Sequence, residues 1–172
     1  MNTEDKLNLA IDTLKYYKQI FEDLWWDYEL PFEWSNKKLW KLNLETTSMP
    51  IDNFYWMLKG FKVDPFNREH NSLHTETLEV VLNHPQKYSE YHNDIEKCNL
   101  FYPIHIFYND YCDKYIILDG VHRFCKLFLQ DKKNLKVKLV EKKHLKKIII
   151  PEGKPFLDKG KVVQTLKQLE NM

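Results

Sequence analysis

Five residues between positions 119 and 126 carry side chains suited to binding and transferring anionic groups: Asp119, Gly120, His122, Arg123 and Lys126. A carboxylate can accept a proton or hold Mg²⁺, and an imidazole can donate to a phosphate or carry a proton. A guanidinium binds phosphate through two parallel N–H donors. Arg123 and Lys126 are three positions apart, so on a helix they share one face and concentrate positive charge there. The spacing indicates an anion site.

The flanking pattern predicts that these residues lie where a strand meets a helix. Residues 115–118 (YIIL) form a continuous apolar run typical of a strand buried on both faces, and residues 121–130 (VHRFCKLFLQ) have helical periodicity. A helix N-terminus offers backbone N–H groups without intrahelical partners, and a glycine there lets a ligand approach the backbone closely. The expected phosphate-binding residues are Gly120, Val121, His122, Arg123 and Lys126.

The same turn supplies the expected catalytic residues. Asp119 is the first candidate for a general base and is also the expected Mg²⁺ ligand. His122 is a second catalytic candidate, and Glu76 is a weaker alternative base. A purely structural interpretation stays open, in which Asp119 only caps the helix and His122 and Arg123 form its solvated first turn.

The stretch IILDGVHRFCKLFLQ, followed by LKVKLV, resembles the ParB/sulfiredoxin superfamily. Members of that superfamily carry a strand, a Gly-x-His-Arg or Gly-x-x-Arg turn, and a helix that binds nucleotide phosphates. The fuller pattern Asp-Gly-x-His-Arg-x-x-Lys is met here, and the similarity to small stand-alone ParB-like proteins extends over about residues 38–150. The resemblance implies ATP or another nucleotide as ligand, Mg²⁺ as cofactor, and a phosphotransferase or NTPase acting on a small molecule.

Two activities of the superfamily are disfavoured. Sulfiredoxins need a Cys between the Gly and the His of the turn, where this chain has Val121. Cys125 lies one helical turn further on and is expected to be a buried, unreactive thiol. Partition-type ParB proteins add a helix-turn-helix domain and a dimerisation tail, for which the sequence after residue 140 leaves no room. The alternatives that stay open are a non-catalytic nucleotide- or protein-binding module and a nucleic-acid-associated ParB-like protein.

The amino-acid composition limits the kinds of partner that the chain is expected to bind. The 172 residues are 43% hydrophobic and 30% charged, yet the net charge is only +1, which disfavours nucleic acid as a partner. No apolar run approaches the roughly 20 residues of a membrane-spanning helix, so no membrane partner is expected. Three cysteines without a CxxC pair favour a reducing, cytoplasmic setting.

The period of the hydrophobic pattern changes near Pro103, from about 3.6 to 2. The change predicts an α+β fold, with a mainly helical N-terminal region followed by a small mixed sheet with a β-α-β unit. The resemblance implies that this sheet is ParB/sulfiredoxin-like. We expect one domain over residues 1–172, with a ParB-like core at 38–150. Residues 1–30 are expected to form an amphipathic helix that packs on its own domain or makes a homodimer, and residues 151–172 contain a tail helix.

Several local features are also expected. Residues 31–50 are interpreted as an irregular connection with short extended pieces, in which Trp34 and Trp40 cover the core. Thr75 is expected to cap a helix over 76–83. In the strand 135–140, Leu139 is expected on the apolar side. Residues 142–150 fit a helix or a strand equally well.

Overall fold

The computed structural model describes residues 34–66, 75–109, 113–148 and 150. The chain divides into two compact units, one formed by Leu44–Leu139 and the other by the segments on either side of it. Both α-helices and a small sheet are present, which confirms the α+β class in general terms. The predicted helices in residues 1–30 and 151–172 lie outside the described residues, and the single-domain organisation stays a prediction.

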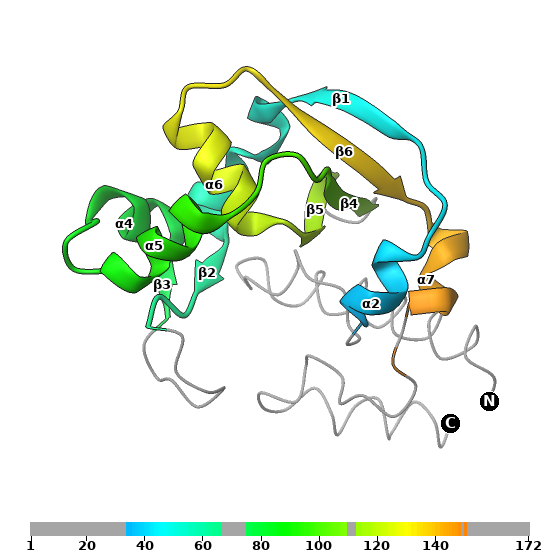
Figure 1. Cartoon of the computed structure of the whole chain (residues 1–172), viewed down its shortest axis with the longest axis horizontal. Coiled ribbons are helices and arrows are strands. Elements are labelled where there is room, and N and C mark those ends of the chain that lie inside the picture. Colours follow the sequence, from blue (N-terminus) through cyan, green and yellow to red (C-terminus); the bar gives the residue numbers. More distant parts are fainter. Residues whose placement is uncertain (1–33, 67–74, 110–112, 149, 151–172) are drawn as a thin grey trace. The chain divides into compact units, whose positions relative to one another are not determined.

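The larger unit is built on a four-stranded sheet with the order β1-β6-β4-β5. The strands are β1 (Thr46–Pro50), β4 (Ile104–Asn109), β5 (Lys114–Asp119) and β6 (Asn134–Val140). β4 and β5 form an antiparallel hairpin, and β1 pairs antiparallel with β6 (Figure 1). The predicted strands at 115–118 and 135–140 are therefore confirmed as β5 and β6, and β4 begins where the period of the apolar residues changes. β5 and β6 are the two strands of the predicted β-α-β unit, and β4 lies between them in the sheet.

Helical segments and a second, two-stranded sheet complete this unit. They are η2 (Ile51–Phe54), α3 (Trp56–Gly60), β2 (Lys62–Val63), β3 (Glu76–Thr77), α4 (Leu78–Asn83), α5 (Ser89–Lys97) and α6 (Val121–Leu129). Helices α5 and α6 contact one another, and Figure 1 shows α4 beside α5. None of the helices in the described ranges is long and apolar enough to cross a membrane.

Helix α4 begins two residues later than predicted. The Thr77 hydroxyl, not that of Thr75, accepts from the backbone N–H of Val80 at 3.4 Å. Glu76 is still extended because it pairs with Val63 in the two-stranded sheet. The tertiary pairing thus delays the start of the helix.

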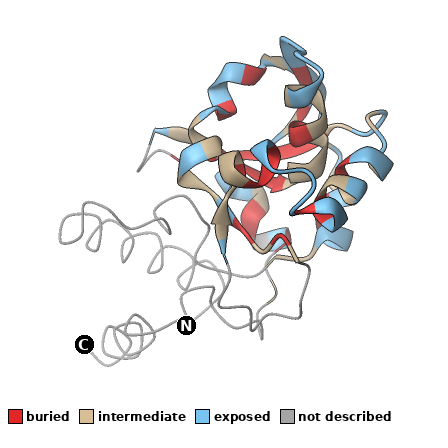
Figure 2. Cartoon of the chain, turned by 90° about the vertical axis from the view of Figure 1, so that its left-hand side faces the viewer, coloured by how far each residue is buried: buried red, intermediate tan, exposed pale blue. Residues whose placement is uncertain are grey.

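Strand β5 is buried on both faces, as the apolar run predicts. Ile116, Ile117 and Leu118 are each 5% exposed, and Figure 2 shows buried segments along the strands and on the helices that cover them. β5 is nevertheless an edge strand of the sheet. Its edge is covered by Trp56, whose indole Nε1–H donates to the carbonyl oxygen of Tyr115 at 3.1 Å. This hydrogen bond satisfies an edge carbonyl and discourages pairing with another strand.

The expected burial of Leu139 is wrong. Leu135 and Val137 are buried, whereas Leu139 is 41% exposed. Thr46 and Lys138 are the last pair of the β1–β6 ladder. Because Leu139 lies beyond that pair, no facing residue of β1 helps to cover it.

The other unit contains two described helices, α2 (Asn36–Trp40) and α7 (Lys142–Ile148). The backbone N–H of Ser35 donates to the carbonyl of Ile148 at 2.9 Å, and the Ser35 side chain caps α2. Part of the segment expected to be irregular is therefore helical, and the undecided segment near the C-terminus is a helix. Trp40 is 58% exposed, so its predicted place over the core is wrong.

Cys125 is fully buried, as predicted, and burial raises the pKa of its thiol to about 12. At pH 8 only about one Cys125 side chain in 10,000 would be a thiolate, so alkylation should require unfolding. Cys98 is the matched control because it is partly exposed. We expect peptide mapping after alkylation of the native protein to find Cys98 labelled before Cys125. Equal labelling rates would contradict the packing of α6.

Candidate functional site

The turn between β5 and α6 depends on the backbone of Gly120. Its φ is +113° and ψ is 25°, a conformation that side-chain-bearing residues rarely adopt. The Gly120 carbonyl accepts the backbone N–H of Phe124 at 2.9 Å, so the helix starts immediately after the turn. No side chain caps the N-terminus of α6 through a hydrogen bond. The turn therefore presents helix N–H groups where β5 ends.

Arg123 folds back over this turn and pairs with Asp119. Its Nη2 donates to Asp119 Oδ2 at 2.8 Å, and the two side chains are only 17% and 18% exposed. A Cβ at position 120 would lie 2.8 Å from the same Nη2, so the guanidinium rests directly on Gly120. Because the pair is largely removed from water, the attraction is stronger than in an exposed ion pair. Asp119 therefore holds Arg123 at the N-terminus of α6.

A buried histidine lies beside this pair. The β4–β5 register places His105 opposite Asp119, and its Nδ1 is 3.8 Å from Asp119 Oδ2. That distance is too long for a hydrogen bond. His105 is 6% exposed, and neither ring nitrogen has a hydrogen-bond partner among the described residues. His105 was not predicted as a site residue; the only sequence signal was a polar residue inside the strand pattern PIHIFY.

His122 packs against α5. Its ring meets Tyr91 edge-on, with 4.7 Å between ring centroids. Burial lowers the pKa of His122, although the Asp94 carboxylate acts in the opposite direction. The imidazole is therefore neutral at pH 7, with one nitrogen able to donate and the other able to accept.

The remaining predicted residues have other neighbours. Lys126 Nζ donates to the carbonyls of Glu96 at 2.5 Å and of Cys98 at 3.2 Å, at the C-terminal end of α5. A cation stabilises a helix at that end, so Lys126 helps to fasten α5 to α6. Glu76 lies in the separate two-stranded sheet. The structure thus brings Asp119, Gly120 and Arg123 together, while phosphate binding by Lys126 and catalysis by Glu76 stay predictions.

A preformed metal centre is not evident in the part of the chain that the structure describes. No group of three or more His, Cys, Asp or Glu side chains lies close enough there to hold a metal ion. Asp119 is the carboxylate of the turn. Mg²⁺ is commonly held by one or two carboxylates together with substrate phosphates and water, and Asp119 fits that requirement only with a phosphate ligand present.

Comparisons of the chain with protein-family models, with curated proteins and with solved structures found no match. The ParB/sulfiredoxin relationship therefore stays a prediction that rests on the motif. The turn between β5 and α6 and its contacts are the features of the chain that bear on function.

Replacing Gly120 with Ala should lower the free energy of unfolding by about 1–3 kcal/mol, because Ala is strained at this φ. The new Cβ would also push Arg123 away from Asp119. Urea unfolding measures the effect, and Gly60→Ala is the control because Gly60 is the last residue of helix α3, where Ala is tolerated.

A double-mutant cycle separates the two contributions. In an Arg123→Ala background the steric part of the cost disappears, so Gly120→Ala should destabilise the protein less there. If Gly120→Ala is neutral in the otherwise unchanged protein, the described turn geometry is wrong.

Proposed function

We propose that the chain binds a nucleotide through the turn Asp119–Arg123 and acts as a phosphotransferase or NTPase on a small molecule. The observation that carries the proposal is the position of Arg123, whose guanidinium rests on Gly120 at the N-terminus of α6. The helix N–H groups and the guanidinium meet there, and both favour the same kind of ligand, a phosphate.

A phosphate competes well with Asp119 for Arg123. The carboxylate offers Arg123 Nη2 one oxygen, whereas a terminal phosphate offers up to three and carries more negative charge. The backbone N–H groups of Val121 and His122 can add further donors to a phosphate bound at this turn. Ligand binding would therefore transfer Arg123 from the carboxylate to the phosphate.

The transfer releases the Asp119 carboxylate from Arg123. It could then act as general base or as the single protein ligand of a Mg²⁺ held mainly by the phosphates, two roles that exclude one another. As base, Asp119 takes the proton of a substrate hydroxyl. The oxygen of that hydroxyl then forms a bond to the terminal phosphorus of the nucleotide. The bond from that phosphorus to the bridging oxygen breaks, and the nucleoside diphosphate leaves. Catalysis of this kind is mainly positioning and charge neutralisation.

The two histidines have separate roles in the proposal. Neutral His122 is placed on the first turn of α6, where one ring nitrogen can donate to a phosphate oxygen. Buried His105 lies next to the Asp119 carboxylate that loses its arginine. A small movement of the His105 ring would bring its Nδ1–H within hydrogen-bond distance of that carboxylate.

A ParB/sulfiredoxin-like fold is part of the same proposal. The order hairpin, turn, α6, β6 is the arrangement that the ParB/sulfiredoxin resemblance implies around its nucleotide site. A cytoplasmic location would provide both the nucleotide and the reducing conditions suited to the free Cys98 and Cys125. A homodimer through residues 1–30 completes the proposal as predicted from the sequence.

Nucleotide binding is tested by thermal unfolding with ATP or ADP, with and without Mg²⁺. A ligand at 100 times its Kd should stabilise the protein by about 2.7 kcal/mol. Arg123→Lys keeps a cation beside Asp119 but loses the planar fork, and should weaken nucleotide affinity about tenfold or more. Arg123→Ala is less suitable, because it removes the cation beside the largely buried Asp119 carboxylate.

Lys132→Gln is the matched control, since Lys132 is exposed beyond the opposite end of α6. The proposal is contradicted if Arg123→Lys binds as tightly as the unchanged protein. Stabilisation by ATP without turnover would identify a nucleotide-binding module in place of an enzyme.

A further inference from the structure

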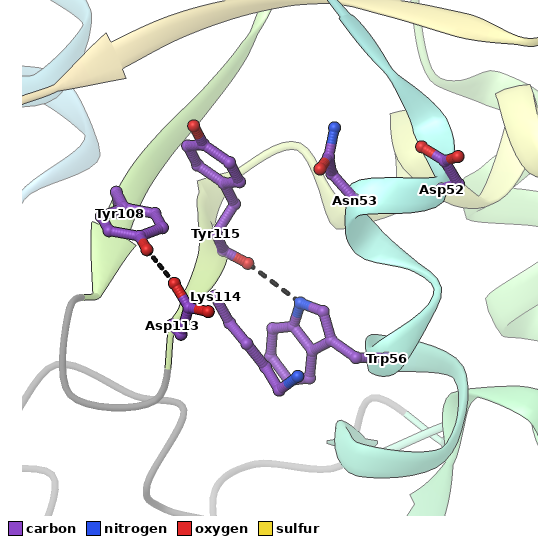
Figure 3. Close-up of a pocket in the computed structure, with 7 residues that line it drawn as sticks. All are labelled: Asp52, Asn53, Trp56, Tyr108, Asp113, Lys114 and Tyr115. Carbon is purple, nitrogen blue, oxygen red and sulfur yellow. Dashed lines mark hydrogen bonds between the residues drawn. The ribbon is translucent and has the colours of Figure 1, made fainter.

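A second candidate site lies at the opposite end of β5 from Asp119. It is a cavity of about 510 Å³ between η2 and α3 on one side and the β4–β5 hairpin on the other (Figure 3). Its walls include Asp52, Asn53 and Trp56 from the first side and Tyr108, Asp113 and Lys114 from the hairpin. We propose that this cavity binds a small organic cation with N–H donors, such as a primary amine or a guanidinium.

The charges of the cavity favour a cation. Asp52 and Asp113 contribute carboxylates from opposite walls, against the single ammonium of Lys114. The Tyr108 hydroxyl donates to Asp113 Oδ1 and so fixes the position of that carboxylate. An anion would be repelled by both carboxylates, whereas a ligand with several N–H groups could donate to both walls.

The aromatic wall favours the same ligand. Lys114 Nζ lies over the Trp56 ring, 6.0 Å from its centroid, so the cavity already places an ammonium against the indole. The hydrogen bond from Trp56 Nε1 to the Tyr115 carbonyl holds the ring in place. An incoming cation would take the position of the Lys114 ammonium. Lys114 is therefore an internal competitor for the ligand.

Because of this competition, removal of a lining residue is expected to raise the affinity for the ligand. Removing the only cation among the lining residues named above should strengthen binding of a cationic ligand, whereas it would weaken binding of an anion. A neutral polyol would meet an amide that both donates and accepts in place of the ammonium, so its affinity should change little. Lys114→Gln therefore separates the three ligand classes.

Isothermal titration calorimetry with agmatine, which carries both an amine and a guanidinium, tests the inference. Lys114→Gln should bind agmatine about two- to fivefold more tightly. Asp52→Asn and Asp113→Asn should each bind it about tenfold more weakly. Glu90→Gln is the matched charge control, because Glu90 is exposed on α5 and does not line the cavity.

Thermal unfolding without ligand verifies that each variant is folded. Weaker binding to Lys114→Gln, unchanged binding to both Asp variants, or equal displacement of agmatine by myo-inositol would overturn the inference. The nucleotide titration of Arg123→Lys is a separate experiment, so either proposal can fail without the other.

Discussion

The ion pair between Arg123 and Asp119 is the interaction on which the geometry of the turn between β5 and α6 depends. It requires a residue without a Cβ beneath the guanidinium, which is Gly120, and a carboxylate at the end of a rigid strand. It also leaves His105 buried at 3.8 Å from the same carboxylate oxygen. A largely desolvated pair of this kind is costly unless both charges stay matched. A phosphate that takes Arg123 therefore has to leave Asp119 compensated.

Strand β5 connects this turn with the second cavity. Its three central residues are buried, and its edge carbonyl at Tyr115 is bound by Trp56. The strand therefore holds Asp119 at one end and Lys114 at the other in fixed positions. The two ends differ in their charged groups, since the turn carries Arg123 over Gly120 and the cavity is lined by Asp52 and Asp113. One buried strand thus positions the residues of both proposed sites.

The main elements could be predicted from sequence because the period of the apolar residues reports burial directly, as it does for β4, β5 and α6. Features that depend on residues far away in the sequence could not be predicted in this way. The pairing of Glu76 with Val63 makes helix α4 begin two residues later than the sequence predicts. His105 lies beside the turn only because of the register of the β4–β5 hairpin. Arg123 and Lys126 do follow helical spacing, yet the carbonyls that Lys126 meets at the end of α5 have no sequence signature.

The proposed transfer of Arg123 from Asp119 to a phosphate can be tested directly, because the chain contains only two arginines, Arg68 and Arg123. In ¹⁵N-labelled protein each arginine gives one Nε–Hε signal, and Arg123→Lys identifies that of Arg123. We expect Asp119→Asn to shift this signal without ligand, and ADP with Mg²⁺ to shift it in the unchanged protein. If saturating nucleotide moves neither this signal nor the backbone signals of Val121 and His122, the turn is not the phosphate site.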